Sequence, residues 1–167
     1  AQRIALESVI VGNEVLLRAT EHASEIEAPP VTEDELLEYI ARVKSQVNVP
    51  VTTAETWHIL KQHPRIVEAV DYVMVHIYPY WEGVDVEAAA QRAIERYREV
   101  QQLSPSKRVV IGETGWPAAG PTVGAAVPSL ENQRRYMREF LALTQQEGIE
   151  FYYFAAFNEL WKTEGGA

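Results

Sequence analysis

Five apolar, β-rich runs are spaced along the chain and predict five strands. Each run is continuous rather than alternating, which is typical of strands covered on both faces, as in a parallel sheet. The runs are Ser8–Val11, Val49–Thr53, Tyr72–Tyr78, Arg108–Ile111 and Phe151–Phe157.

The stretches between the first three runs carry helical signals. Thr32 and Glu35 form a capping-box pattern ahead of apolar residues that recur at a 4-3-4 spacing between positions 36 and 47, as one helix face requires. The segment Thr56–Val70 is a weaker candidate because Pro64 interrupts it. We expect Pro64 to begin a second short helix there.

Two longer helices are predicted in the second half of the chain. One runs from Asp85 through Gln102, and the other from Ser129 to Gly148, where a serine cap opens the helix and a glycine ends it. The segment Pro117–Pro128 between them is rich in glycine and proline and has no helical pattern. It is expected to be a long loop after the fourth strand, and a candidate lid.

The resulting β-α-β-α-β-α-β-α-β order predicts an α/β fold with a parallel sheet and right-handed crossovers. Units of about 30 to 40 residues suit a (β/α) barrel or a doubly wound sheet. Five units are too few for a closed eight-stranded barrel, which takes about 250 residues. We therefore expect residues 1–167 to form a single domain that is part of a larger fold.

Composition narrows the possible partners. The net charge of −9 disfavours nucleic acid and other polyanions, and a neutral substrate suits this surface better. The chain has no cysteine and no HExxH motif, so a catalytic metal is not expected. It also has no GxGxxG or GxxxxGK loop, which disfavours a nucleotide, and no cofactor is predicted. No apolar run approaches the roughly 20 residues that a membrane helix requires.

Polar and aromatic residues follow every predicted strand. In parallel α/β folds the functional site lies at the carboxyl ends of the strands, so the recurrence of this layout after five strands predicts a site there. The segments are Asn13-Glu14, Thr52–Trp57, His76–Glu82, Gly112–Pro117 and Phe157–Lys162.

Glu14 and Glu113 are the two candidate catalytic carboxylates. A pair of carboxyl groups that faces a sugar ring can cleave a glycosidic bond, and aromatic rings bury the apolar faces of sugars. Glu14 could instead be a helix cap or an ion-pair partner, whereas the Gly-Trp-Pro sequence near Glu113 indicates a tight turn. Glu55 could line the substrate cleft or be a carboxylate at the start of a helix. His76 could contact substrate or be a buried histidine that is hydrogen-bonded within the protein.

Four segments resemble the signature segments of glycoside hydrolase family 17, the β-1,3-glucanases and related transglucosylases. They are VIVGNE, VHIYPYW, VVIGETGWP and FYYFAAFNELWK, in that family's order. The resemblance covers nearly the whole chain from Val9 onward and implies strands four to eight of an eight-stranded (β/α) TIM-type barrel. Within the family, VGNEVLLR, TTAETWH, YPYWEG and GETGWP look closest to the bacterial branch, which implies a bacterial enzyme.

The resemblance implies the main catalytic roles. Glu14 would be the general acid/base and Glu113 the nucleophile, Asn13 would hydrogen-bond the 2-hydroxyl of the sugar, and Tyr78 would orient Glu113. A carboxyl separation of about 5–5.5 Å would indicate a covalent glycosyl-enzyme and retention at the anomeric carbon.

Further roles follow from the same resemblance. Glu159 and Lys162 would support the acid/base, with Glu159 offsetting the charge of Lys162. Trp116, Tyr80 and Trp81 would line the subsites that bind the glucan.

The predicted function is therefore a retaining hydrolase or transglycosylase on β-1,3-glucan, periplasmic or extracellular and possibly part of a membrane-tethered enzyme. Strands one to three would be missing, and open sheet edges invite pairing with another chain. We expect either a longer natural protein with an N-terminal half or a homodimer. The alternative is a partial barrel that binds glucan or associates with itself without turnover.

Overall fold

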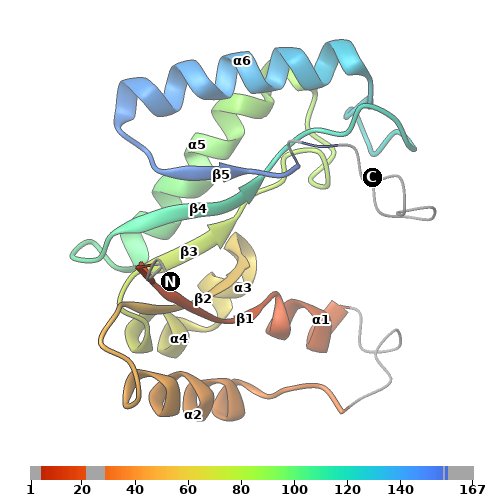
Figure 1. Ribbon diagram of the computed structural model, residues 1–167. Helices are drawn as coiled ribbons and strands as arrows, with labels where there is room; N and C mark the ends of the chain where they lie inside the picture. The colour runs from red at the N-terminus through yellow and green to blue at the C-terminus, as the bar shows by residue number, and fades with distance from the viewer. Residues whose placement is uncertain (1–4, 22–28, 156, 158–167) are drawn as a thin grey trace. The chain divides into compact units, whose positions relative to one another are not determined.

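The computed structural model describes residues 5–21, 29–155 and 157. They form five strands and six helices in an alternating order (Figure 1). The elements are β1 Val9–Asn13, α1 Val15–Glu21, α2 Glu33–Lys44, β2 Val51–Thr56, α3 Trp57–Gln62, α4 Pro64–Ala69, β3 Val73–His76, α5 Val86–Leu103, β4 Val109–Thr114, α6 Leu130–Glu147 and β5 Phe151–Tyr153.

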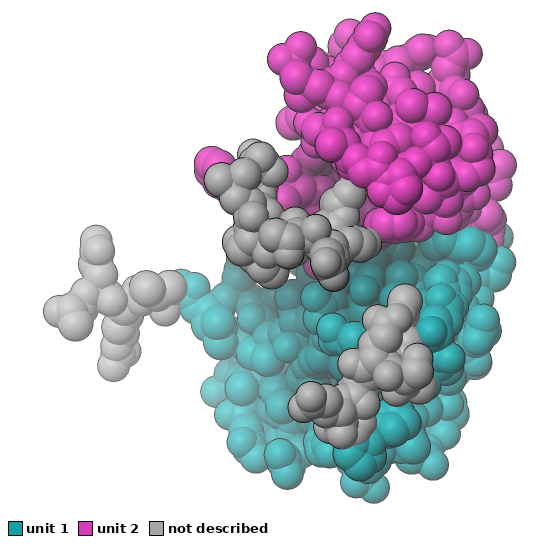
Figure 2. All heavy atoms as spheres, turned by 90° about the vertical axis from the view of Figure 1, so that its right-hand side faces the viewer, with its two compact units in different colours: residues 1–76, 100–110 teal, residues 77–99, 111–167 magenta. Residues whose placement is uncertain are grey.

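The strands belong to one sheet in the order β1-β2-β3-β4-β5, with β1–β2, β2–β3 and β4–β5 paired in parallel. The predicted α/β class, a partial barrel of βα units, is confirmed. The chain divides into two compact units, coloured separately in Figure 2. Unit 1 comprises residues 1–76 and 100–110, and unit 2 comprises residues 77–99 and 111–167.

Most predicted helices are confirmed, down to their caps. Thr32 and Glu35 form both hydrogen bonds of the capping box at the start of α2. Ser129 caps α6, and Gly148 ends it with a left-handed φ of 66°. Pro64 opens α4 at its first turn, which divides the weaker helical segment into α3 and α4 as expected.

Several elements differ from their predictions. Strand β4 ends three residues later than predicted, at Thr114, whereas β3 and β5 end two and four residues earlier, at His76 and Tyr153. Two further differences lie in unit 1. The short helix α1 begins just after β1 and was not predicted. The apolar residues of its first turn lie so close to the apolar run of the strand that the change from strand to helix spacing cannot be recognised in the sequence. Strand β2 extends to Thr56, three residues beyond the predicted end, so Glu55 lies on a strand and not at a helix start. Both differences fall beside the first catalytic candidate.

Unit 1 buries its core between β1–β3 and the helices α2, α3 and α4. Leu36 and Ile40 present the buried face of α2, and each is 1% exposed. Helix α2 packs on β1 and β2, while α3 packs on β2 and β3 (Figure 1). The pairing of β1 with β2 shifts between Ile10 and Asn13, where β1 carries one more residue than its partner. Such a bulge bends a strand and re-aims the side chains that follow it.

Unit 2 has an aromatic core. Tyr136 and Phe140 on α6 are fully buried, and the ring of Phe140 meets Phe151 of β5 edge-on at 5.0 Å. The hydroxyl groups of Tyr136 and Thr114 are hydrogen-bonded at 2.5 Å, which satisfies both buried polar atoms. The β4–β5 pairing also shifts, between Ile111 and Thr114.

Replacing Ser129 by alanine should destabilise unit 2 through α6. The Ser129 hydroxyl accepts a hydrogen bond from the amide of Asn132 at 3.0 Å, and loss of such a cap costs about 0.5–2 kcal/mol. We expect a lower midpoint of urea unfolding for Ser129→Ala. Ser106→Ala, at an exposed turn, serves as the control and should change the unfolding free energy by less than about 0.5 kcal/mol. Equal midpoints for the two variants would contradict the capping role.

Candidate active site

Glu14 lies at the carboxyl end of β1, in a main-chain turn that is conformationally demanding. Gly12 has a φ of 84° and Glu14 itself a φ of 52°, a left-handed conformation that costs a non-glycine residue roughly 1–2 kcal/mol. The turn is held from both sides. The amide of Glu14 donates to the carbonyl of Ala54 at 2.8 Å, and its carbonyl accepts from the amide of Arg18 at 3.0 Å. A strained residue that is fixed in this way is common at functional sites.

His76 binds the side chain of Glu14. Its Nδ1 lies 2.8 Å from Oε1 of Glu14, and the imidazole is 2% exposed, whereas the Glu14 side chain is 26% exposed. The interior-histidine interpretation of His76 is thus confirmed. The contact also gives His76 a role that sequence reasoning did not assign, since the two residues are 62 positions apart.

Glu55 is completely buried beside the same turn. Its Oε1 accepts from the amide of Leu16 at 2.7 Å, and its Oε2 accepts from the amide of Leu17 at 3.4 Å. Burial raises the pKa of the Glu55 carboxyl, the two amide hydrogen bonds oppose this, and the nearby Glu14 adds to the rise. The prediction that Glu55 starts a helix in its own segment is therefore wrong: Glu55 lies on β2 and binds the first turn of α1, a different helix.

Glu113 occupies the corresponding place on β4, in unit 2. The hydroxyl of Tyr78 donates a hydrogen bond to its Oε2 at 2.6 Å. The shifted register between Ile111 and Thr114 brackets Glu113, as the shift in β1 precedes Glu14. Gly115 must be a glycine, because a Cβ there would lie 1.9 Å from the carbonyl oxygen of Phe154.

The three predicted subsite aromatics differ in exposure. Trp81 is 49% exposed, whereas Tyr80 and Trp116 are 1% and 2% exposed. Their rings form an edge-to-face series, with centroids 4.8 Å apart from Trp81 to Tyr80 and 5.6 Å apart from Tyr80 to Trp116. In this structure Trp81 therefore presents the ring, and the other two support it from behind.

The loop 117–128, a candidate lid, is tied to its surroundings in unit 2. The Tyr80 hydroxyl donates to the carbonyl of Pro121, and the Trp116 indole donates to the carbonyl of Val127 at 3.1 Å. The amide of Ala125 donates to the carbonyl of Gly83 at 2.9 Å. These bonds tie the loop to Tyr80, Gly83 and Trp116, and its predicted role as a lid stays a prediction.

The remaining predicted residues divide into two groups. Asn13 is exposed at the end of β1, and its carbonyl accepts a hydrogen bond from Arg18. Glu159 and Lys162 lie outside the described residues, so their predicted support of the acid/base stays a prediction.

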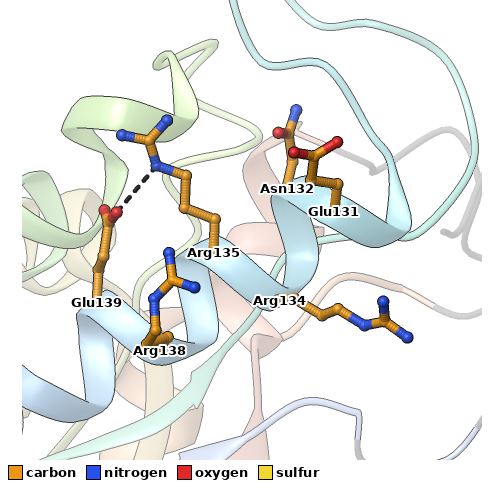
Figure 3. A pocket seen from close by; sticks show the side chains of 6 residues that line it. All are labelled: Glu131, Asn132, Arg134, Arg135, Arg138 and Glu139. Atoms are coloured by element: carbon orange, nitrogen blue, oxygen red, sulfur yellow. Dashed lines mark hydrogen bonds and ion pairs between the residues drawn. The ribbon is translucent and has the colours of Figure 1, made fainter.

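A hollow on the surface of unit 2 lies elsewhere. It is lined by residues of α6, and Figure 3 shows Arg135 and Glu139 pointing toward one another across an ion pair of 2.9 Å. Arg135 also pairs with Glu87 at 2.9 Å. None of the predicted site residues that the structure describes lines this hollow, which is therefore distinct from them. The lining residues are Glu131, Asn132, Arg134, Arg135, Arg138 and Glu139.

Parallel βα units with carboxyl groups, an amide and aromatic rings at the strand ends define the class of glycoside hydrolases with a barrel-type site. Sequence comparison gives the family. The sequence model of the BtgE/BtgC glycoside hydrolase domain matches residues 2–167, and the chain belongs to this family.

Known relatives agree with that assignment. The chain is 29% identical to a glucan 1,3-beta-glucosidase of Schizosaccharomyces pombe, over 96% of this chain and 51% of that protein. It is 30% identical to the glucan 1,3-beta-glucosidase of Arthroderma benhamiae, over 95% of this chain and 56% of that protein. The chain thus spans about half the length of the curated relatives it matches.

A solved structure is similar as well. The family 17 β-1,3-glucanosyltransferase of Rhizomucor miehei superimposes with a TM-score of 0.82 at 34% identity, over 95% of this chain and 56% of that chain. An active-site mutant of the Rhizomucor enzyme was crystallised with laminaritriose. The predicted membership of glycoside hydrolase family 17 is confirmed. The bacterial origin is not supported, because these relatives are fungal.

Replacing Gly12 by alanine should disturb the Glu14 turn more than a matched substitution elsewhere. A Cβ at Gly12 would lie 2.6 Å from Cγ2 of Val15, in addition to the cost of its φ of 84°. Gly148, at φ 66°, has nothing within 4 Å of a Cβ and isolates the backbone cost, about 1–2 kcal/mol. We expect thermal unfolding to show the larger loss for Gly12→Ala. Equal losses for Gly12→Ala and Gly148→Ala would mean that the Val15 contact is unimportant.

Proposed function

We propose that this chain carries the catalytic residues of a retaining enzyme that acts on β-1,3-linked glucans, by hydrolysis or by glucosyl transfer. One observation carries the proposal: Glu14 and Glu113 each end a parallel strand in a chain of a glycoside hydrolase family. The names of the relatives, glucan 1,3-beta-glucosidase and β-1,3-glucanosyltransferase, support the choice of linkage.

The reaction has two displacements. In the first, a carboxylate oxygen of Glu113 attacks the anomeric carbon while the glycosidic bond breaks and Glu14 gives its proton to the leaving oxygen. The product is a glucosyl ester of Glu113. In the second, Glu14 takes a proton from water or from a sugar hydroxyl, whose oxygen attacks the same carbon and breaks the ester. Two inversions retain the configuration, and no cofactor is needed.

Neighbouring side chains support these roles. The hydrogen bond from Tyr78 holds the carboxyl group of Glu113 in one orientation, which suits a nucleophile. His76 fixes the rotamer of Glu14 from the end of β3. Asn13 is exposed beside Glu14, where its amide is available to a sugar hydroxyl. Glu159 and Lys162 are proposed to act on Glu14 as the family resemblance implies.

The proposed substrate is a neutral β-glucan chain. It suits a protein with a net charge of −9, and the exposed ring of Trp81 offers a platform for the apolar face of a glucose unit. Action on such a polymer favours a location outside the cytoplasm. Among the helices that the structure describes, none has the length and apolarity to cross a bilayer. Association with a second copy or with an N-terminal half has no support from the relatives and stays a prediction.

The alternative, a partial barrel that binds glucan without turnover, is not favoured by the relatives, which are named as enzymes. The two activity tests below separate it from the proposed enzyme, because a binding protein would retain affinity for laminarin and release no sugar.

Glu113→Gln should lower the rate of cleavage of laminari-oligosaccharides by several orders of magnitude. The amide cannot form the covalent ester, so the first displacement is lost. The measurement is kcat/KM for the purified natural gene product. Glu131→Gln, an exposed change on α6, is the matched control and should behave as wild type. Turnover near the wild-type rate in Glu113→Gln would rule out the nucleophile assignment.

Product analysis should show retention at the anomeric carbon. Proton NMR taken within the first turnovers should detect a β-anomer from a β-1,3 linkage, because two inversions cancel. Oligosaccharides longer than the substrate would indicate transfer, and shorter ones alone would indicate hydrolysis. An α-anomer as the first product would exclude the double displacement.

A further inference from the structure

The buried carboxylate of Glu55 holds the start of α1 by its side chain. It accepts hydrogen bonds from Leu16 and Leu17, the second and third residues of this helix. Helix α1 has seven residues, and a helix this short is unstable by itself. The position of α1 therefore depends on the hydrogen bonds that hold its first turn.

The same strand that holds α1 also binds the main chain around Glu14. Successive residues of β2 bind successive parts of the turn: the Thr53 hydroxyl donates to the carbonyl of Gly12 at 3.3 Å, and the carbonyl of Ala54 accepts from the amide of Glu14 at 2.8 Å. Glu55 follows on the same strand and binds the two amides just beyond Val15. Glu14, in its left-handed conformation, is thus enclosed between bonds made by one strand.

Burying a carboxylate is costly, so a role limited to capping a seven-residue helix explains Glu55 poorly. An exposed Ser, Thr, Asp or Asn at the N-cap would stabilise the helix without that cost. A buried carboxylate with two amide donors is rigid, and rigidity is what an acid/base residue needs from its support. The charged and titratable groups that act on Glu55 are Glu14 and His76.

We propose that Glu55 is a positioning residue for Glu14: through the amides of Leu16 and Leu17 it sets the turn that aims the Glu14 carboxyl at the leaving oxygen. This inference rests on the proposed function. A displacement of about 1 Å in a reacting group can lower a rate by about 100-fold. Loss of Glu55 should therefore impair proton transfer selectively, and not the attack by Glu113.

The test compares two leaving groups in the full-length natural gene product. Laminari-oligosaccharides need a proton on the leaving oxygen. A 2,4-dinitrophenyl β-laminaribioside needs none, because its 2,4-dinitrophenolate leaves as a stable anion. For Glu55→Gln we expect kcat/KM to fall about 10- to 100-fold on the oligosaccharide and to change less than about 3-fold on the dinitrophenyl substrate. Glu14→Ala should show the same selectivity with a larger loss.

A double variant and a control complete the test. If Glu55 works through Glu14, adding Glu55→Gln to Glu14→Ala should cause no further loss on the oligosaccharide. Glu35→Gln, which alters the exposed capping box of α2, is the matched control and should affect neither substrate. Partial unfolding lowers both rates equally and leaves their ratio unchanged. If Glu55→Gln does not fold, Glu55→Asp, which keeps the charge and shortens the reach, is measured by the same ratio.

Equal losses on both substrates for Glu55→Gln, or additive losses in the double variant, would overturn the positioning role while leaving Glu14 as the acid/base. Glu14→Ala without any leaving-group selectivity would contradict the proposed function itself, and the role of Glu55 with it.

Discussion

The turn between β1 and α1 depends on a buried carboxylate that stands on the next strand. Glu55 accepts two main-chain hydrogen bonds from α1, and its neighbours Thr53 and Ala54 bind Gly12 and Glu14. An unpaired carboxylate in the interior would be strongly unfavourable, so Glu55 and the first turn of α1 require each other. Because Glu14 lies between these bonds, its left-handed conformation follows from packing rather than from its own preference.

Unit 2 supports its carboxylate in a different manner. Glu113 receives a hydrogen bond from a phenol, and the residues around it are fixed by aromatic packing and by hydrogen bonds to a loop. The series of rings from Trp81 through Tyr80 and Trp116 continues to Tyr136, which ties the exposed platform to the core beneath α6. A sugar bound on Trp81 would therefore meet a ring that its neighbours hold in place.

A shared feature links the two carboxylates. In both strands the register slips near a glycine, Gly12 in β1 and Gly112 in β4, so each strand carries one residue more than its partner. A bulge re-aims the side chain at the end of a strand without changing the direction of the sheet. The glycine lies two residues before Glu14 and one residue before Glu113.

The sequence by itself determined the βα order, the family, and those features whose physical cause lies within a few residues. The capping box at Thr32, the serine and glycine at the ends of α6, and the break at Pro64 are local hydrogen bonds and steric effects, so their residue types reveal them. Only the tertiary structure decided that Glu55 binds α1, that His76 binds Glu14, and that Tyr80 and Trp116 are buried while Trp81 is exposed. These contacts join residues 39 and 62 positions apart or depend on burial, which arises from packing between elements and leaves no periodic trace in the chain.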